Sequence, residues 1–206
     1  EHATRDEAKQ GLIKAWKRQV ESDPSAFRIM VAHTNADAQQ LNAEARAWLV
    51  EKGHVHGDSA TVQTPSGKRE FAINDLVRFG RNDNRMDVKN GTLGTVVAAG
   101  EDKLIVEVRK GDTRETVAVD LTLYRQLEHG YASTVHKAQG STVDSALVLA
   151  TPGMERQMTY VAMTRHRDRA ELHYGADDFR GRSRSSSEDP RMTARYAHVV
   201  DMAKKN

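Results

Sequence analysis

Residues that can bind phosphate gather in one short stretch of the sequence, YASTVHKAQG, at residues 131–140. Thr134 and His136 can donate hydrogen bonds to phosphate oxygens, and Lys137 adds positive charge. Gly140 lets a backbone N–H approach a ligand closely. A parallel sheet presents groups of this kind to a ligand at the carboxyl ends of its strands. An ordinary polar loop has a similar composition, so the spacing alone leaves both interpretations open.

A second candidate for chemistry is Arg165, the last residue of the string YVAMTR at residues 160–165. A guanidinium that reaches a γ-phosphate stabilises the charge that develops during phosphoryl transfer and strongly accelerates the reaction. The competing interpretation is a surface cation near the C-terminus of a helix, where it interacts favourably with the helix dipole.

The elements expected to position these residues begin with a helix, a strand and a second helix. Residues 4–21 show the apolar spacing of an amphipathic helix with a capping-box sequence at its start, and residues 27–32, FRIMVA, predict a buried strand. Thr34 or Asn35 can cap the second helix, which extends to about residue 51. This order of elements is typical of the first part of an α/β layer.

From residue 58 to residue 123 the sequence instead alternates short apolar strands with turn residues such as Asn90-Gly91. About five short strands in about sixty residues predict a small β-barrel rather than a layer of a parallel sheet. The α/β pattern then returns, with strands predicted at residues 125–128, 145–150 and 170–174 and a helix at residues 154–164.

We therefore predict an α/β domain in two halves, residues 1–57 and 124–180, interrupted by a β-barrel insertion at residues 58–123. Residues 181–206 begin with a polar, serine-rich segment and are expected to form a mobile linker followed by a last helix. The sequence starts with Glu1 rather than Met, so we expect it to be part of a longer polypeptide.

The composition limits the classes of function. There are 31 Lys and Arg against 29 Asp and Glu, a formal charge of +2, so a nucleic-acid site would have to be local. The absence of cysteine excludes thiolate chemistry and agrees with a cytoplasmic location. No apolar run is long enough for membrane insertion. His54 and His56 lack a third ligand at a sensible spacing, so no metal is expected there.

The two candidate stretches together resemble the last two signature motifs of superfamily 1 helicases, T-x-H-K-x-Q-G and Y-V-A-x-T-R. The form they resemble most is the helicase region of conjugative relaxases of the TraA and MobA type, where the second motif also continues into R-H-R-D-R, residues 165–169 here. The resemblance implies the second RecA-like lobe of the motor. It also implies that residues 58–123 are the SH3-like barrel inserted in this lobe of RecD-like helicases.

The resemblance also implies roles for the residues of the first motif. Thr134 and His136, with Lys137 beside them, would hold the backbone of single-stranded DNA. Gln139 and Gly140 would lie nearer the nucleotide and belong to the ATP site.

In the second motif, Arg165 would be the catalytic arginine finger and would contact ATP. The sequence departs from the UvrD-type pattern at Thr142, where a glutamate usually meets the nucleotide sugar, which puts that sugar contact in doubt.

Two further segments match the family in part. The stretch His33-Thr34-Asn35-Ala36 resembles the start of the fourth helicase motif. Its Thr34 and Asn35 would contact DNA, although capping of a helix explains them equally well. The arginine that follows in that motif is replaced by Gln39, and Arg46 lies two turns later on the same predicted helix.

In the predicted barrel, Arg78 would contact DNA as part of a basic rim that also includes Arg81, Arg85 and Lys89. A polar loop that serves solubility is the alternative. Gly91 and Gly94 are interpreted as structural residues of hairpins and bulges.

In such a helicase, the first lobe supplies the phosphate loop and the acidic Mg²⁺ ligands, and this sequence contains neither pattern. ATP and Mg²⁺ would be bound mainly by that lobe, and this fragment alone is expected to be inactive as an ATPase. The expected partners are single-stranded DNA, the first RecA-like lobe of the same polypeptide and the conjugative secretion machinery.

A second hypothesis is a module without motor function that binds single-stranded DNA or is recognised by the secretion machinery. Gln39 and Thr142 favour this alternative, whereas Arg165 favours the motor.

Overall fold

The structure is a computed structural model that describes five segments of the chain: residues 1–111, 113–138, 143–154, 156–163 and 166–180. Contacts divide the chain into two compact units. Residues 1–41 and the described residues from 132 onward form the first unit, and the described residues between 42 and 131 form the second. The predicted limits of the insertion, residues 58 and 123, both lie inside this second unit.

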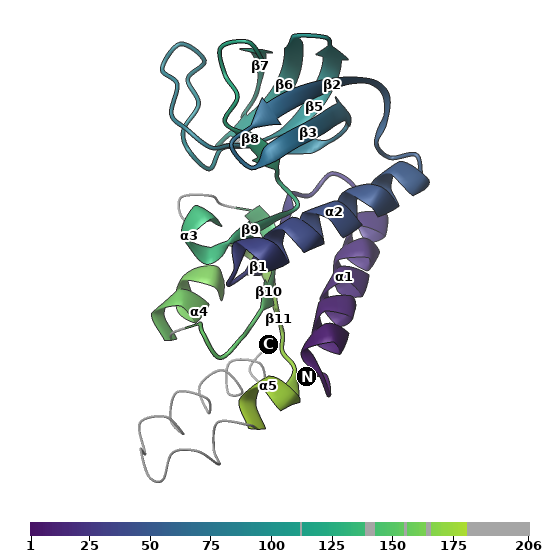
Figure 1. Cartoon of the computed structure of the whole chain (residues 1–206), viewed down its shortest axis with the longest axis vertical. Helices are drawn as coiled ribbons and strands as arrows, with labels where there is room; N and C mark the ends of the chain where they lie inside the picture. Colours follow the sequence, from purple (N-terminus) through teal and green to yellow (C-terminus); the bar gives the residue numbers. More distant parts are fainter. Residues whose placement is uncertain (112, 139–142, 155, 164–165, 181–206) are drawn as a thin grey trace. The chain divides into compact units, whose positions relative to one another are not determined.

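The first unit is built on a four-stranded parallel sheet with the strand order β11-β10-β1-β9 (Figure 1). The strands are β1 (Arg28–Ala32), β9 (Ala132–Thr134), β10 (Val143–Leu149) and β11 (His166–His173). All residues of β1 are buried, as expected for a strand with a neighbour on each side in a parallel sheet. The sheet confirms the predicted α/β class.

Helices flank this sheet in the first unit. They are α1 (Arg5–Ser22), α3 (Val135–Ala138), α4 (Arg156–Met163) and α5 (Ala176–Arg180), together with the start of α2 (Asn35–Glu51). Helix α1 packs on β1, β10 and β11, and α3 contacts α4 (Figure 1). The predicted cap of α1 is present, because the Glu7 backbone N–H donates to Thr4 Oγ1 at 3.2 Å.

The second unit contains the rest of α2 and two antiparallel sheets. One sheet pairs β2 (His56–Thr64) with β3 (Gly67–Ile73), and the other has the order β7-β6-β5-β4-β8. The strands of this second sheet are β4 (Leu76–Phe79), β5 (Leu93–Gly100), β6 (Lys103–Lys110), β7 (Thr113–Asp120) and β8 (Leu127–His129). A shared core that includes Phe71, Phe79 and Val106 joins the two sheets.

One predicted strand belongs to a different sheet from the one expected. We assigned residues 125–128 to the returning α/β pattern, but β8 pairs antiparallel with β4, for example Leu127 with Phe79. Leu127 is fully buried in the core of the second unit. A three-residue strand carries too little periodicity to indicate its partner, so only the tertiary structure assigns it.

Candidate nucleic-acid interface

The carboxyl ends of three parallel strands lie at one edge of the first unit's sheet. In the register, Ala32 of β1 is opposite Thr134 of β9, and Val31 is opposite Val148 of β10. Neighbouring strands of a sheet are about 4.8 Å apart, so the segments that follow β1 and β9 leave the sheet side by side. This is the edge at which open α/β sheets bind ligands.

Thr134 is the last residue of β9 and is largely buried, at 7% exposure. Its hydroxyl accepts the backbone N–H of Lys137 at 3.4 Å, so it caps the short helix α3. His136 is exposed and Lys137 is half-buried. Both lie on α3 at the carboxyl edge of the sheet.

The start of α2 has a similar arrangement. Thr34 Oγ1 accepts the backbone N–H of Asp37 at 3.1 Å and donates to Asp37 Oδ2 at 2.7 Å. Of the two predicted caps, therefore, Thr34 caps the helix, and Asn35 is its exposed first residue. Hence α2 and α3 both begin at the same sheet edge with a threonine hydroxyl as the cap.

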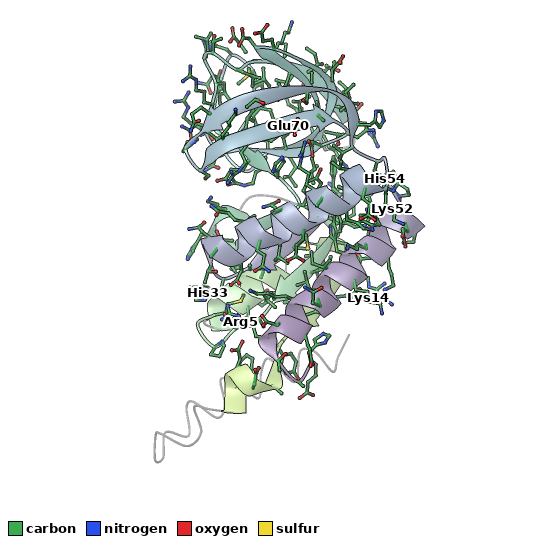
Figure 2. All side chains as sticks on the ribbon, turned by 45° about the vertical axis from the view of Figure 1, so that its right-hand side comes forward. Arg5, Lys14, His33, Lys52, His54 and Glu70 are labelled. Atoms are coloured by element: carbon green, nitrogen blue, oxygen red, sulfur yellow. The ribbon has the colours of Figure 1, made fainter. Side chains whose placement is uncertain are left out.

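The carboxylate of Asp37 ties α2 to α1. Arg5 Nη2 lies 2.8 Å from Asp37 Oδ2, and Lys9 Nζ lies 2.7 Å from Oδ1; Figure 2 shows Arg5 on α1. Burial raises the pKa of Asp37, but hydrogen bonds from Lys9 and Thr34 and the charge of Arg5 outweigh it, so the pKa is lower than usual. These two cations therefore act as partners of a buried carboxylate.

His33, the first residue of the stretch that resembles the fourth motif, also lies at this edge, although the sequence analysis assigned it no role. It follows β1 directly, and its Nδ1 is 3.3 Å from Oγ1 of Thr151, in the segment that follows β10. Figure 2 shows His33 immediately before α2. In the sequence, the signal for a role of His33 was its position directly after a buried strand, and this signal is weak.

In the second unit, Arg78 differs from the other residues of the predicted basic rim. Its side chain is only 4% exposed, and Nη1 lies 3.2 Å from Glu128 Oε2. This burial favours a structural role for its charge over contact with a phosphate. Arg81, by contrast, is exposed and lies over the ring of Tyr124, with Cζ 5.7 Å from the ring centroid.

Arg85 and Lys89 are also exposed. Arg85 Nη2 pairs with Asp83 Oδ2 at 2.9 Å. The hydrogen bond from the Arg85 side chain is the main cause that lowers the pKa of Asp83 to about 2. Part of the positive charge of this rim is therefore offset locally.

Arg46, which lies two turns after Gln39 on α2, has its side chain bound to two carboxylates. Its Nε donates to both carboxylate oxygens of Asp75, at 3.0 and 3.2 Å, and Nη2 lies 3.3 Å from Glu70 Oε2. Asp75 is fully buried. These contacts favour a structural role for Arg46 within the second unit, while Gln39 is exposed on α2.

Four residues considered for the nucleotide site, Gln139, Gly140, Thr142 and Arg165, lie outside the described residues. Within the described segments, no group of three or more His, Asp or Glu side chains is placed to hold a metal ion. In the same segments, no helix is long and apolar enough to cross a membrane.

Known proteins match this chain over the segment that contains both helicase-like stretches, residues 131–140 and 160–165. The UvrD-like helicase C-terminal domain family matches residues 129–172, which include β9, α3 and α4. The chain is 42% identical over 173 residues to the probable conjugal transfer protein TraA of Sinorhizobium fredii, a match that covers 84% of this chain and 15% of the relative. It is 37% identical over 99 residues to the ATP-dependent RecD2 DNA helicase of Deinococcus radiodurans, covering 46% of this chain and 13% of that protein.

Solved structures share the fold. Pif1 helicase from Candida albicans matches with a TM-score of 0.53 and 17% identity, over 86% of this chain and 50% of that one. Pif1 helicase from Bacteroides, in complex with ADP-AlF3 and single-stranded DNA, matches with a TM-score of 0.52 and 21% identity, over 80% and 43%. The chain thus spans a small part of its TraA relatives, and it is similar to the C-terminal lobe of superfamily 1 helicases as found in conjugal transfer proteins.

Proposed function

We propose that this chain is the C-terminal motor lobe of an ATP-dependent DNA helicase or translocase within a conjugative relaxase. In this role it grips single-stranded DNA at the carboxyl edge of its parallel sheet. It also supplies Arg165 as an arginine finger to ATP bound by a first lobe. The similarity to conjugal transfer proteins and to helicases supports this assignment.

The observation that carries the DNA-binding part is the register of β1 with β9. It brings the start of α2, at Thr34 and Asn35, beside the start of α3, at Thr134. Backbone N–H groups at helix N-termini attract phosphate, and hydroxyl, imidazole and ammonium groups supplement them. His136 and Lys137 lie in α3, which is a single turn, and add the imidazole and the positive charge.

The second unit adds a rim of exposed basic residues to the proposal. Arg81, Arg85 and Lys89 are exposed in the loop between β4 and β5. We propose that this unit is the SH3-like insertion of the lobe and that the rim contacts the phosphate backbone. The burial of Arg78 makes it a support of this rim rather than a direct contact.

ATP and Mg²⁺ enter the proposal through the first lobe, which would supply the phosphate loop and the acidic ligands. The Pif1 helicase from Bacteroides, which has a similar fold, was solved in complex with ADP-AlF3 and single-stranded DNA. In our proposal Arg165, with Gln139 and Gly140 near the nucleotide, completes the site from the second lobe.

A module that binds single-stranded DNA, or is recognised by the secretion machinery, without motor function is the second candidate. The specific observation in its favour is that exposed Gln39 stands where the fourth motif has an arginine. Arg46 does not take that place in the described structure, because it pairs with Asp75 and Glu70.

Binding of this chain to fluorescent single-stranded oligonucleotides across a salt series tests the DNA-binding part. We expect salt-dependent binding that the double variant His136→Ala, Lys137→Ala weakens at least tenfold. It should also reduce the slope of log K against log salt, because fewer phosphate charges are neutralised. Lys14→Ala is the matched control, because Lys14 is an exposed lysine on α1.

Equal losses in the double variant and in Lys14→Ala would indicate general charge attraction and contradict a defined site. Unchanged binding in the double variant would remove α3 from the interface. ATPase assays of the complete protein then separate the motor from the binding module, because only the motor hydrolyses ATP.

A further inference from the structure

Two residues of the segment that follows β10 lie against the ring of His33 at the sheet edge. Its Nδ1 is 3.3 Å from Thr151 Oγ1. The ring also lies against Gly153, where an added Cβ would be only 2.3 Å from Cε1 and 2.6 Å from Nδ1 of the imidazole. Such distances are shorter than any van der Waals contact, so the absence of a side chain at Gly153 leaves the space that the ring fills.

The contact with Thr151 favours a proton on one ring nitrogen of His33 over the other. Thr151 is only 4% exposed, and a buried hydroxyl needs an acceptor for its hydrogen. Within the described segments, the acceptor that its side chain meets is Nδ1 of His33. An imidazole that accepts at Nδ1 carries its proton on Nε2. His33, which is partly exposed, then presents an N–H donor at its other nitrogen.

We propose that His33 binds phosphate, with Nε2–H donating to a non-bridging oxygen of the single-stranded DNA backbone. This inference rests on the proposed function, because it extends the same site. His33 follows β1 directly, next to the capped start of α2, and β1 is paired with the strand that leads into α3. A ring already fixed by Thr151 and Gly153 loses little conformational entropy on binding, which increases the benefit of the hydrogen bond.

Two variants separate the role of Nε2 from that of Nδ1. In His33→Asn, the amide can replace Nδ1 beside Thr151, but the donor at Nε2 is lost. In His33→Gln, the longer amide can replace the Nε2 donor. We expect His33→Asn to bind oligonucleotide about tenfold more weakly than wild type and His33→Gln to bind within about threefold of it, since a hydrogen bond to a charged group has about this effect.

The salt dependence provides a second readout that a structural role would not produce. A neutral donor displaces no counterion, so His33→Asn should weaken binding at every salt concentration without changing the slope. Lys137→Ala should reduce the slope by about 0.7, the value for one charge on a single strand. Changed stability alone would not give this pattern.

A third readout uses the wild-type chain and does not depend on the folding of any variant. Long-range ¹H–¹⁵N spectra of the His33 ring should show the Nε2–H form and a shift of Nε2 on addition of oligonucleotide. ATP at the same phosphate concentration should leave that resonance unchanged. A shift with ATP alone would assign the phosphate to a nucleotide and overturn the proposal.

Different experimental results would contradict the inference about His33 and the proposed function. If wild type does not bind oligonucleotide, the proposed DNA site fails, and His33 with it. If the His136→Ala, Lys137→Ala variant loses binding while His33→Asn retains it, only the inference about His33 is overturned. Weaker binding by His33→Gln than by His33→Asn would show that the contact with Thr151 matters instead, which also overturns it.

Discussion

At the scale of single residues, the buried carboxylate of Asp75 is the centre of a hydrogen-bond network in the second unit. Tyr131 Oη donates to Asp75 Oδ1 at 2.7 Å, the Ala72 backbone N–H donates to Oδ2 at 2.8 Å, and Arg46 binds both oxygens. A buried charge is tolerated only when it is paired and hydrogen-bonded in this way. Tyr131 thus has a structural role at the first position of the stretch YASTVHKAQG.

The Tyr131→Phe variant tests this network. Removing the hydroxyl takes one donor from Asp75 and leaves the backbone N–H of Leu76 without the acceptor that it has at 3.2 Å. We expect a loss of about 1–3 kcal/mol in the free energy of unfolding, measured by urea denaturation at pH 7. A loss below about 0.5 kcal/mol would mean that water or another group replaces the hydroxyl.

The effect of Tyr131→Phe on stability should also depend on pH. Burial, and then the charge of Asp75, raise the pKa of Tyr131 well above its usual value. Below about pH 10 the hydroxyl is protonated in the folded and unfolded states, and its contribution to stability is fully present. As the pH rises further, the unfolded state ionises first and the contribution declines. The stability difference between wild type and Tyr131→Phe should therefore be constant from pH 7 to 9 and shrink above about pH 10. A constant difference at higher pH would contradict the assignment.

At the scale of elements, close approach of backbones decides where glycine is required. Gly94 lies in β5, where an added Cβ would be 2.5 Å from Val106 Cγ1 and 2.8 Å from the Glu107 carbonyl oxygen of β6. Val106 is fully buried, so its side chain has little room to move. This geometry agrees with the interpretation of Gly94 as a structural residue.

Gly94→Ala should therefore destabilise the protein by about 1–3 kcal/mol, the usual cost of inserting a methyl group into a packed core. Gly100→Ala is the matched control in the same strand, because the nearest atom to its added Cβ, the Lys103 carbonyl oxygen, is 3.9 Å away. The control should be neutral or slightly stabilising. Equal urea midpoints for the two variants would contradict this explanation.

The link between α1 and α2 predicts a second pH dependence. The pKa of Asp37 is lowered in the folded state, so its contribution to stability is present above the unfolded pKa of about 4 and is lost as the pH falls below it. We expect Asp37→Asn to lose about 1–3 kcal/mol at pH 7, because Arg5 and Lys9 lose their charged partner. Unfolding curves of wild type and variant should approach each other as the pH falls below about 4. Curves that stay separated there would show that the charge of Asp37 is not the cause.

At the scale of the whole molecule, two units share one chain, and the second is inserted into the first. Residue 131 is the last of the inserted unit, and β9 of the parallel sheet begins at the next residue. The stretch that carries Thr134, His136 and Lys137 therefore starts at the return of the chain into the first unit. In the proposed motor this lobe provides one side of the ATP site.

Substitution of Arg165 in the complete protein tests that role. We expect Arg165→Ala to reduce ATP hydrolysis at least a thousandfold, as loss of an arginine finger does, while binding of single-stranded DNA stays within about twofold. Arg169→Ala is a control, because Arg169 is exposed and pairs with Glu171 on β11. Retained hydrolysis in Arg165→Ala would exclude the finger. The fragment by itself should not hydrolyse ATP.

Local sequence determined much of this protein. Apolar periodicity identified α1, β1 and β10, and Thr4 with Glu7 marked the first helix start, because these signals arise from neighbouring residues. The short strands predicted for residues 58–123 are present there as β3 to β7, and β2 begins two residues earlier, at His56. The motif residues from 131 onward indicated the resemblance to helicases, and the UvrD-like helicase C-terminal domain family matches residues 129–172.

Only the tertiary structure decided how distant residues meet. It paired β8 with β4, buried Arg78 against Glu128, and joined Arg46 to Asp75 across 29 positions of the sequence. It also brought His33 to Thr151, which is 118 positions away. Such contacts depend on strand order and register, and periodicity within a single segment contains no information about either. The sequence thus determined most of the elements and the resemblance to helicases, whereas the fold determined which polar residues lie at the sheet edge and which stabilise the core.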